Sequence, residues 1–215
     1  MEDFVLNWNQ KKILKNIQFL EKYGVYLAGG TALALHFGHR TSQDLDFYTP
    51  RHFDSEAVYG DFKKVFKEEK ISEPDFAKDT LRFKLNTTDL FFFRYPYPLI
   101  RPLRSWESAK VMSEEDILAM KIEAIVSRGY KRDFVDIYFA IKKYGVKQIL
   151  EFYKEKYPEA FNEYKCIAAL TYFENAEKDE QGRKRIYIYS GITWLKIKKY
   201  IIEEIKKYQL SLIKK

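Results

Sequence analysis

Asp44 and Asp46 are the two residues whose types and spacing point most directly to chemistry. Asp44 precedes the run Leu45–Tyr48, and Asp46 lies within it. This short apolar and aromatic run ends before a Thr-Pro pair and is typical of a β-strand. Residues two apart on a strand point to the same face, with Cα atoms roughly 6.5 to 7 Å apart. Two carboxylates on one face repel each other unless a cation lies between them. The alternative is a pair of solvent-facing acids on an edge strand.

The cation that suits such a pair is Mg²⁺. It takes hard oxygen ligands, and one or two carboxylates, several waters and substrate phosphates complete its coordination. Two ions about 4 Å apart could bind both the attacking and the leaving oxygen of a displacement reaction. Asp44 and Asp46 are therefore the expected metal ligands, in a one-metal or a two-metal site.

A glycine pair lies upstream of the two acids. Val25–Ala28 reads as a strand that ends on Gly29 and Gly30, and Thr31 opens a run with helical character. A strand that turns into a helix through glycines exposes backbone N–H groups to a phosphate, and glycine allows close approach. The alternative is a plain tight turn. The pair is not a Walker A loop, because no Gly-Lys-Ser/Thr sequence follows it.

The elements around these residues change in character along the chain. The sequence predicts mixed α/β structure up to about residue 104 and helices after it, hence a core at 1–104 and a helical lobe at 105–215. The expected fold class is α/β (α+β), with a small mixed sheet flanked by helices and then an α-helical C-terminal lobe. The expected strands are 25–28, 45–48, 81–85 and 90–95. The expected helices are 5–22, 31–37, 55–69, 114–128, 131–143, 148–157, 162–173 and 192–212.

Composition sets limits on the function. The 215 residues are 46% hydrophobic, so the chain can bury a core, and the net charge of +7 permits an anionic partner such as a nucleotide or RNA. A single cysteine, Cys166 in an apolar helical run, predicts a buried structural thiol and a cytoplasmic protein. No signal peptide is expected from the acidic start, and no apolar run reaches the roughly 18 to 20 residues that would span a membrane. His36 and His39 lack a third ligand nearby, so no zinc site is expected.

Four stretches together resemble one family. They are Leu27–Leu35 with Gly-Gly-Thr, His39–Phe47 with Arg-Thr-Ser-Gln-Asp-Leu-Asp, Phe91–Leu99 with Tyr-Pro-Tyr-Pro, and Lys121–Tyr138 with Lys-Ile-Glu and Arg-Asp-Phe-Val-Asp. In this order they resemble the nucleotidyltransferases typified by the AbiEii/AbiGii toxins, in the polymerase-β-like superfamily. The resemblance covers about residues 20–145. It implies transfer of a nucleoside monophosphate from an NTP, with Mg²⁺, to an acceptor such as tRNA or protein.

The resemblance also implies roles for individual residues. Gly29, Gly30 and Thr31 would hold the triphosphate, and Asp44 and Asp46 would bind Mg²⁺. Two residues beside the acids, Arg40 and Ser42, would either contact phosphate or fix the loop.

Further roles fall on the helical half. Lys121 would reach the nucleotide phosphates. Asp133 and Asp136 would either position other groups or take part in the site, and Arg132 is spaced to pair with Asp136 on one helix face. Arg128 would be either a phosphate ligand or a surface cation, and the surface cation is favoured.

A third carboxylate is the open point. Many nucleotidyltransferases place one on a following strand, where it acts as general base. The nearest acid here is Asp89, although alignment on the Tyr-Pro-Tyr-Pro segment places the expected acid nearer Phe91. Asp89 shares the strand face of Phe91, so it would point inward as the base, or it is a turn residue.

The biological setting implied by the resemblance is a toxin–antitoxin pair, with an antitoxin protein as partner. Two other hypotheses remain at this stage. One is a catalytically impaired nucleotide-binding module. The other is an RNA- or protein-binding protein that uses its lysine-rich C-terminal helix, whose charges can equally form a solvated face.

Overall fold

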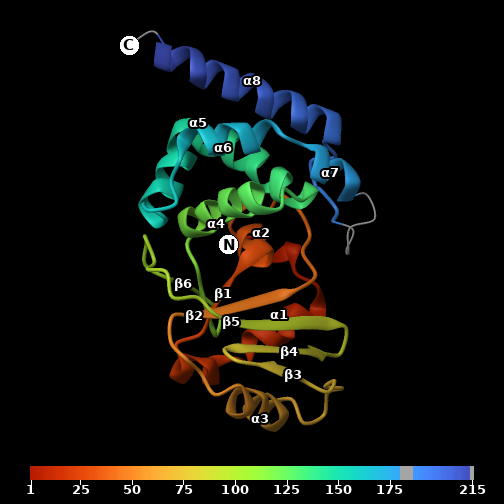
Figure 1. Ribbon diagram of the computed structural model, residues 1–215. Coiled ribbons are helices and arrows are strands. Elements are labelled where there is room, and N and C mark those ends of the chain that lie inside the picture. The colour runs from red at the N-terminus through yellow and green to blue at the C-terminus, as the bar shows by residue number, and fades with distance from the viewer. Residues whose placement is uncertain (180–185, 214–215) are drawn as a thin grey trace. The chain divides into compact units, whose positions relative to one another are not determined.

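The computed structural model describes residues 1–179 and 186–213 (Figure 1). The chain divides into two compact units. The first comprises Met1–Pro98 and Pro102–Glu114, and the second comprises Leu99–Arg101 and Glu115–Lys215. Residues 99–101 therefore pack with the second unit, although the chain on either side of them belongs to the first.

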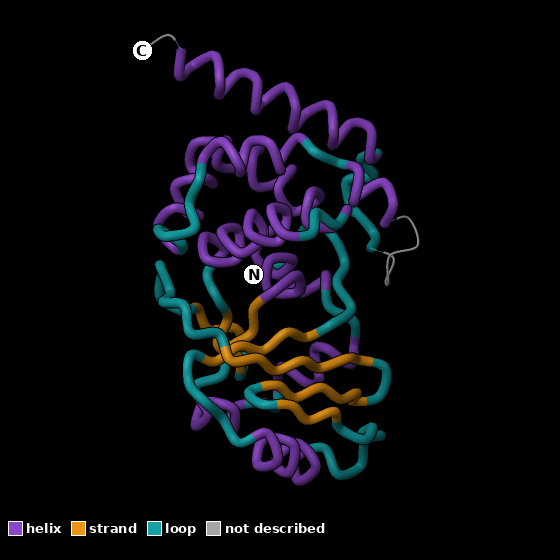
Figure 2. Tube along the Cα trace, viewed as in Figure 1, coloured by secondary structure: helices purple, strands orange, loops and turns teal. Residues whose placement is uncertain are grey.

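The first unit is built on one mixed sheet, which in the described residues has seven strands in the order β3-β4-β5-β2-β1-β7-β6 (Figure 2). The pairings β2–β5 and β1–β7 are parallel, and the other pairings are antiparallel. This arrangement confirms the predicted α/β class with a mixed sheet. The strands are β1 Tyr26–Ala28, β2 Leu45–Thr49, β3 Asp75–Ala77, β4 Thr80–Leu85, β5 Thr88–Arg94, β6 Arg104–Trp106 and β7 Ala109–Val111.

Three of these strands have no counterpart among the sequence-based predictions. β3, β6 and β7 are only three residues long, which is too short for an alternation of apolar and polar residues to be recognised in the sequence. Their strand character comes from pairing with neighbours rather than from local preference. In β7, Val111 pairs with Leu27 of β1, so the strands that follow residue 104 belong to the first unit.

The N-terminal helix is shorter than predicted. A single helix over 5–22 is wrong, because α1 covers Trp8–Lys15 and a separate 3-10 turn, η2, covers Gln18–Tyr23. Asn7 opens α1 with a capping box to Gln10, and the side chain of Asn16 donates a hydrogen bond to the Lys12 carbonyl. Such a side-chain bond to the backbone competes with helix continuation. The other helical elements of the unit are η1 Asp3–Val5, α2 Gly29–Phe37 and α3 Ser55–Val65.

Burial alternates along the two central strands and gives the sheet two unlike faces. One face is core: Phe92 of β5 packs on Phe47 of β2 with ring centroids 4.9 Å apart, and on Phe62 of α3 at 5.6 Å. Residues in between, such as Asp46 and Phe91, are only half-buried and point to the opposite face. The alternation therefore places Asp46 on the open face of the sheet.

The second unit is helical. Its helices are α4 Glu114–Ser127, α5 Lys131–Lys156, α6 Glu163–Thr171, α7 Glu174–Lys178 and α8 Trp194–Ile213. Gly145 has a φ of 76° and breaks α5 between the two helices that the sequence predicts for this region. α8 packs on α5 and α6 and buries the stripe Ile197, Ile201 and Ile205. Burial raises the pKa of the Cys166 thiol to about 11, in keeping with a structural thiol. No helix in the described residues is long and apolar enough to cross a membrane.

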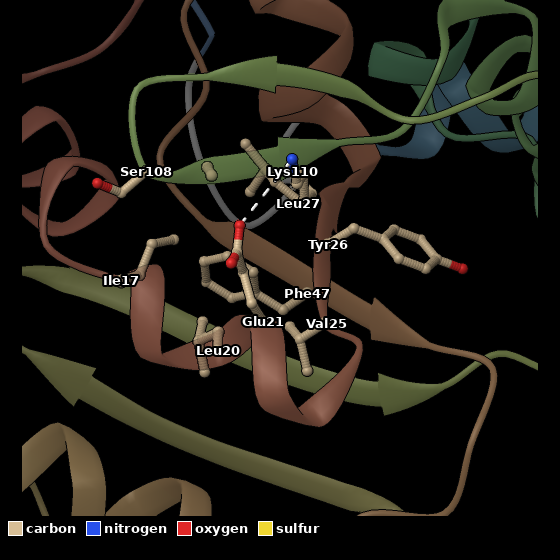
Figure 3. A pocket seen from close by; sticks show the side chains of 10 residues that line it. Ile17, Leu20, Glu21, Val25, Tyr26, Leu27, Phe47, Ser108 and Lys110 are labelled. Carbon is tan, nitrogen blue, oxygen red and sulfur yellow. Dashed lines mark ion pairs between the residues drawn. The ribbon is translucent and has the colours of Figure 1, made fainter.

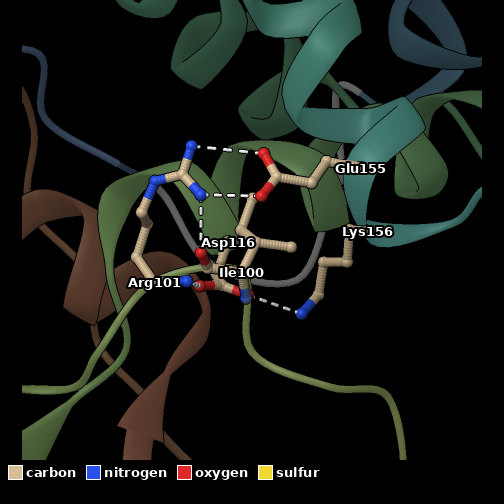
Figure 4. A network of polar contacts seen from close by, with 5 residues as sticks. All are labelled: Ile100, Arg101, Asp116, Glu155 and Lys156. Carbon is tan, nitrogen blue, oxygen red and sulfur yellow. Dashed lines mark hydrogen bonds and ion pairs between the residues drawn. The ribbon is translucent and has the colours of Figure 1, made fainter.

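A buried charge network ties the proline-rich connector into the second unit (Figure 4). The Asp116 carboxylate accepts hydrogen bonds from the backbone N–H groups of Ile100 and Arg101, at 3.0 and 3.1 Å. It also pairs with Lys156 at 2.6 Å, with both side chains fully buried. Arg101 in turn binds both carboxylate oxygens of Glu155, at 2.7 and 3.2 Å. Because buried charges need partners, this network fixes the backbone at residues 100 and 101.

Candidate active site

The acid on β2 meets the start of α2 directly. A Cβ built on Gly29 would lie 2.3 Å from Oδ2 of Asp46, so the carboxylate rests against the Gly29 backbone in space that any side chain would fill. Gly29 also has a φ of 65°, a conformation that L-residues rarely adopt. β1 and β2 are paired with Ala28 opposite Asp46, which brings the two segments together. The predicted association of the glycine pair with an aspartate is thus a direct contact.

The first turn of α2 offers backbone donors at this contact. Gly29, Gly30 and Thr31 are its first three residues, and the N-cap residue Ala28 makes no side-chain capping bond. The first N–H groups of a helix have no intrahelical partners, and the helix dipole adds positive potential there. The arrangement can therefore bind an anionic group such as a phosphate beside the Asp46 carboxylate.

The buried side chain of Arg40 lies against Gly30. Arg40 is 1% exposed. Its guanidinium lies against Gly30, since a Cβ built on that glycine would be 2.8 Å from Nη2. Nη1 donates to the Thr41 carbonyl at 2.9 Å. The Ser42 hydroxyl lies on the same side, 3.4 Å from that Cβ position. Of the two predicted roles, this burial favours fixing the loop over contacting phosphate.

Thr31 is likewise placed inside. Its side chain is fully buried, and its hydroxyl donates to the backbone carbonyl of Asp44. This bond holds the residue before β2 against the first turn of α2, so Thr31 positions one of the two acids. Because the hydroxyl donates to that buried carbonyl, only the backbone N–H of Thr31 is left for the predicted role in triphosphate binding.

Gln10 is a supporting residue that the sequence analysis missed. Its side chain is fully buried, and Nε2 donates to the Ser42 carbonyl at 3.0 Å, which anchors the loop that carries Arg40. The sequence contained a usable signal, since Asn7 and Gln10 have the spacing of a capping box. That signal identifies the helix start but not the long-range contact.

Asp44 and Asp46 provide hard carboxylate oxygens, and both are half-buried. In the described residues, no group of three or more His, Cys, Asp or Glu side chains is gathered closely enough to hold a metal ion. Two carboxylates nevertheless fit Mg²⁺, which completes its coordination with water and substrate phosphates. His36 binds the Met112 carbonyl at 2.8 Å, in a structural contact between α2 and the end of β7.

Asp89 lies on the same open face as Asp46, but not opposite it. The residue paired with Asp46 across β2 and β5 is Phe91. Asp89 is paired with Lys84 of β4, and the two side chains form an ion pair at 3.4 Å. Asp89 is within β5 rather than in the turn before it, so its carboxylate does face the side predicted for a general base. Its role as the third carboxylate stays a prediction.

Comparisons with known proteins identify the family of the chain. A family model described as "Nucleotidyl transferase AbiEii toxin, Type IV TA system" matches residues 12–187. The chain belongs to the AbiEii nucleotidyltransferase toxin family. The predicted resemblance is thereby confirmed, and the protein is a nucleotidyl transfer enzyme.

Individual known proteins are similar to this chain over most of its length. The protein aq_aa25 of Aquifex aeolicus (strain VF5) is 33% identical over 190 residues, which are 85% of this chain and 87% of that protein. A solved structure of a candidate nucleotidyltransferase from H. pylori has a TM-score of 0.63 at 16% identity, over 97% of this chain and 98% of that one. MenT4, the nucleotidyltransferase toxin Rv2826c of Mycobacterium tuberculosis H37Rv, has a TM-score of 0.58 at 14% identity, over 90% and 80%. These two structures share the fold.

Within the second unit of this AbiEii-family enzyme, Lys121 is clamped by two acids. Its ammonium lies 2.8 Å from Asp133 and 2.8 Å from Asp136, and both carboxylates are fully buried. Arg128, which is half-exposed, reaches Asp133 at 3.5 Å. Arg132 stacks its guanidinium over the Tyr130 ring. The clamp favours the positioning role for the two acids, while phosphate binding by Lys121 stays a prediction.

A small pocket of about 200 Å³ lies elsewhere in the first unit (Figure 3). Apolar side chains line it, among them Leu20 and Phe47, and Glu21 and Lys110 approach each other at its mouth with 3.9 Å between charged atoms. Phe47 points to the core face of β2, whereas Asp46 points to the open face. The pocket is therefore separated from the Asp46 contact by the sheet.

Replacing Gly29 with alanine tests the contact between α2 and β2. The positive φ and the overlap with Asp46 should lower the free energy of unfolding by about 1–3 kcal/mol and displace the carboxylate. Gly60→Ala in α3 is the matched control, because its Cβ meets no atom within 4 Å, and it should raise stability by about 0.5–1 kcal/mol. Urea denaturation of both variants measures the difference. Equal stability of the two would show that the Gly29 conformation carries no strain for alanine.

Proposed function

We propose that this AbiEii-family enzyme transfers a nucleoside monophosphate from an Mg²⁺-bound NTP to an acceptor, either RNA such as tRNA or a protein, at the contact between α2 and Asp46. The observation that carries the proposal is the Asp46 carboxylate resting on the Gly29 backbone, beside the uncapped first turn of α2. Negative phosphate and a metal-binding carboxylate need to lie side by side in such a reaction.

The residues present fit the metal. Gly29 has no Cβ, which leaves Asp46 room at the helix start, and Asp44 is held close by the bond from Thr31. Asp44 and Asp46 would be the protein ligands of Mg²⁺, as one or two carboxylates are in phosphate-handling sites. When bound, the metal would neutralise part of the triphosphate charge and polarise the phosphorus that reacts.

The protein's own groups account for binding and orientation. The N–H groups of Gly29 and Gly30 would hold the triphosphate, while the buried Arg40 keeps their loop in place. An acceptor oxygen attacks the α-phosphorus, a new P–O bond forms, and the bond to the β-phosphate breaks to release pyrophosphate. If the acceptor is a hydroxyl, its proton must pass to a base, and Asp89 is the candidate on the same sheet face.

A specific observation favours a second candidate, a nucleotide-binding module with impaired catalysis. Phe91 rather than an acid pairs with Asp46, and Asp89 is held in an ion pair with Lys84. A third candidate, a protein that binds RNA through the lysines of α8, predicts binding that falls steeply with salt and survives loss of Asp46. As for its setting, the enzyme would act in the cytoplasm as the toxin of a toxin–antitoxin pair, with an antitoxin protein as partner.

The deciding experiment is transfer of label. The protein is incubated with each α-³²P-labelled NTP in turn, with Mg²⁺ or with EDTA, and with total RNA or total protein as acceptor. Label should enter one acceptor class, with one NTP preferred, and only when Mg²⁺ is present. Binding of Mg²⁺–NTP without incorporation into any acceptor would support the impaired module instead, and incorporation in EDTA would overturn the metal assignment.

A further inference from the structure

The open face of the sheet beside Asp46 carries an ordered grid of side chains. Strand register places Arg82 of β4, Phe91 of β5 and Asp46 of β2 in one row. The next row is Thr80, Phe93 and Tyr48. Neighbouring strands lie about 4.8 Å apart, so the rings and the acid are within the span of one or two nucleotides.

The two phenylalanines of this grid hold their rings parallel to each other. Phe91 and Phe93 have ring planes only 6° apart, with centroids separated by 6.2 Å along the strand. The ring centroid of Tyr48 lies 5.7 Å from that of Phe93, and both phenylalanines are half-buried. Phe92, which packs in the core, lies on the other face of the same strand. Rings held parallel on the open face instead resemble a stacking surface for planar groups.

Cations border the rings on the side away from Asp46. The Arg82 guanidinium lies over the Phe93 ring at 6.0 Å, and its side chain is 52% exposed. Its nearest acid, Asp75, is 4.0 Å away and 73% exposed, so this is a weak surface pair that a phosphate can displace. Lys84, in the row on the other side of Arg82 from Thr80, is 58% exposed and forms its ion pair with Asp89. Rings flanked by cations match the alternation of bases and phosphates in a nucleic-acid strand.

We propose that Phe91 and Phe93 stack unpaired bases of a polynucleotide acceptor, with Arg82 binding its backbone, so that the strand ends at Asp46. The inference rests on the proposed function in that it names the acceptor of the same site. The acceptor is single-stranded at the platform, because bases held in a duplex cannot lay their faces on protein rings. A polypeptide acceptor is disfavoured, since it would need backbone or side-chain partners that this grid of rings and cations does not offer.

Oligonucleotide binding without NTP or Mg²⁺ tests the platform apart from the transfer reaction. The probes are fluorescein-labelled 12-nucleotide strands of RNA and of DNA, and the same RNA annealed to its complement, followed by fluorescence anisotropy. Phe91→Leu and Phe93→Leu keep an apolar side chain on the strand and remove the ring. Each should raise the Kd for single strands about 10-fold, and Arg82→Ala should reduce the slope of log Kd against log salt by about one.

Phe76→Leu is the matched control. Phe76 is 44% exposed on β3, but its ring packs edge-on against Tyr59 of α3 and thus lies on the opposite face, so its loss should leave the Kd unchanged. Binding of both RNA and DNA strands supports the platform, and tighter binding of RNA would identify the 2′-hydroxyl as a further contact. Unchanged Kd in both phenylalanine variants, equal binding of duplex and single strands, or no binding of any strand would each overturn it.

The result is separable from the fate of the transfer reaction. Ring-dependent binding without label transfer would leave the platform standing and contradict the proposed activity. Label transfer to protein with no oligonucleotide binding would do the reverse. Far-UV circular dichroism of each variant checks folding, and because Phe91 and Phe93 are tested separately, a folding defect in one leaves the other as the test.

Discussion

Changing Asp46 to asparagine is expected to reduce nucleotidyl transfer by on the order of 1,000-fold while the protein stays folded. The substitution keeps the shape of the side chain beside Gly29 but removes the charge that would bind Mg²⁺. A neutral amide is a poor ligand for a hard divalent cation, and the triphosphate would lose its bridge to the protein. Asp44→Asn should have a similar effect. The measurement is the initial rate of α-³²P incorporation at saturating NTP and Mg²⁺.

Glu56→Gln provides the matched control for this prediction. Glu56 is an exposed acid in the first turn of α3, and α3 packs on the core face of the sheet, opposite to Asp46. Its loss should change the rate less than 2-fold, because exposed charges contribute little. An Asp46→Asn protein that retains a tenth or more of the activity would show that the carboxylate does not hold the metal. The metal site would then have to be sought elsewhere.

Changing Lys121 to methionine is expected to lower the free energy of unfolding by about 3–5 kcal/mol. The substitution leaves two fully buried carboxylates, Asp133 and Asp136, that share one cation at 2.8 Å from each. Removing one partner of a buried ion pair is costly because the remaining charge stays out of water. Guanidinium chloride unfolding followed by far-UV circular dichroism would measure the change.

Two comparisons separate a structural Lys121 from a nucleotide-binding one. Arg128→Met removes a half-exposed cation 3.5 Å from Asp133 and should cost less than about 1 kcal/mol. The triple change Lys121→Met, Asp133→Asn and Asp136→Asn removes the unpaired charges and should recover part of the lost stability. If Lys121→Met instead kept its stability and lost only transfer, the ammonium would act on the nucleotide and the clamp would contribute little.

Local patterns in the sequence were sufficient for the main features of the site. The strand that ends on Gly29, the helix that follows and the strand with Asp46 are each determined by neighbouring residues: apolar runs, a glycine pair and a proline stop. The α/β class and the AbiEii-type assignment follow from the same segments, and both are confirmed. Even the kink at Gly145 was visible, because a helix break is a property of the local backbone.

Side-chain roles depended instead on partners distant in the chain. Thr31 and Arg40 carry polar groups that suit phosphate equally well in the sequence, but folding buries one against the Asp44 carbonyl and the other beneath Gly30. In the sequence, Lys121 has no evident partner, but in the fold Asp133 and Asp136 of α5 form ion pairs with it. Pairing, burial and neutralisation arise between segments, so no local pattern contains them.

Strand register is the clearest case. The short strand β7 forms because β1 supplies a pairing edge, and β6 forms by pairing with β7 in turn. The same kind of pairing places Phe91 rather than Asp89 opposite Asp46. It also places Arg82 of β4 opposite Phe91, on the side away from Asp46. A shift of one residue would turn every one of these side chains to the other face. The sequence thus identified the acids, whereas the sheet determined what stands beside them.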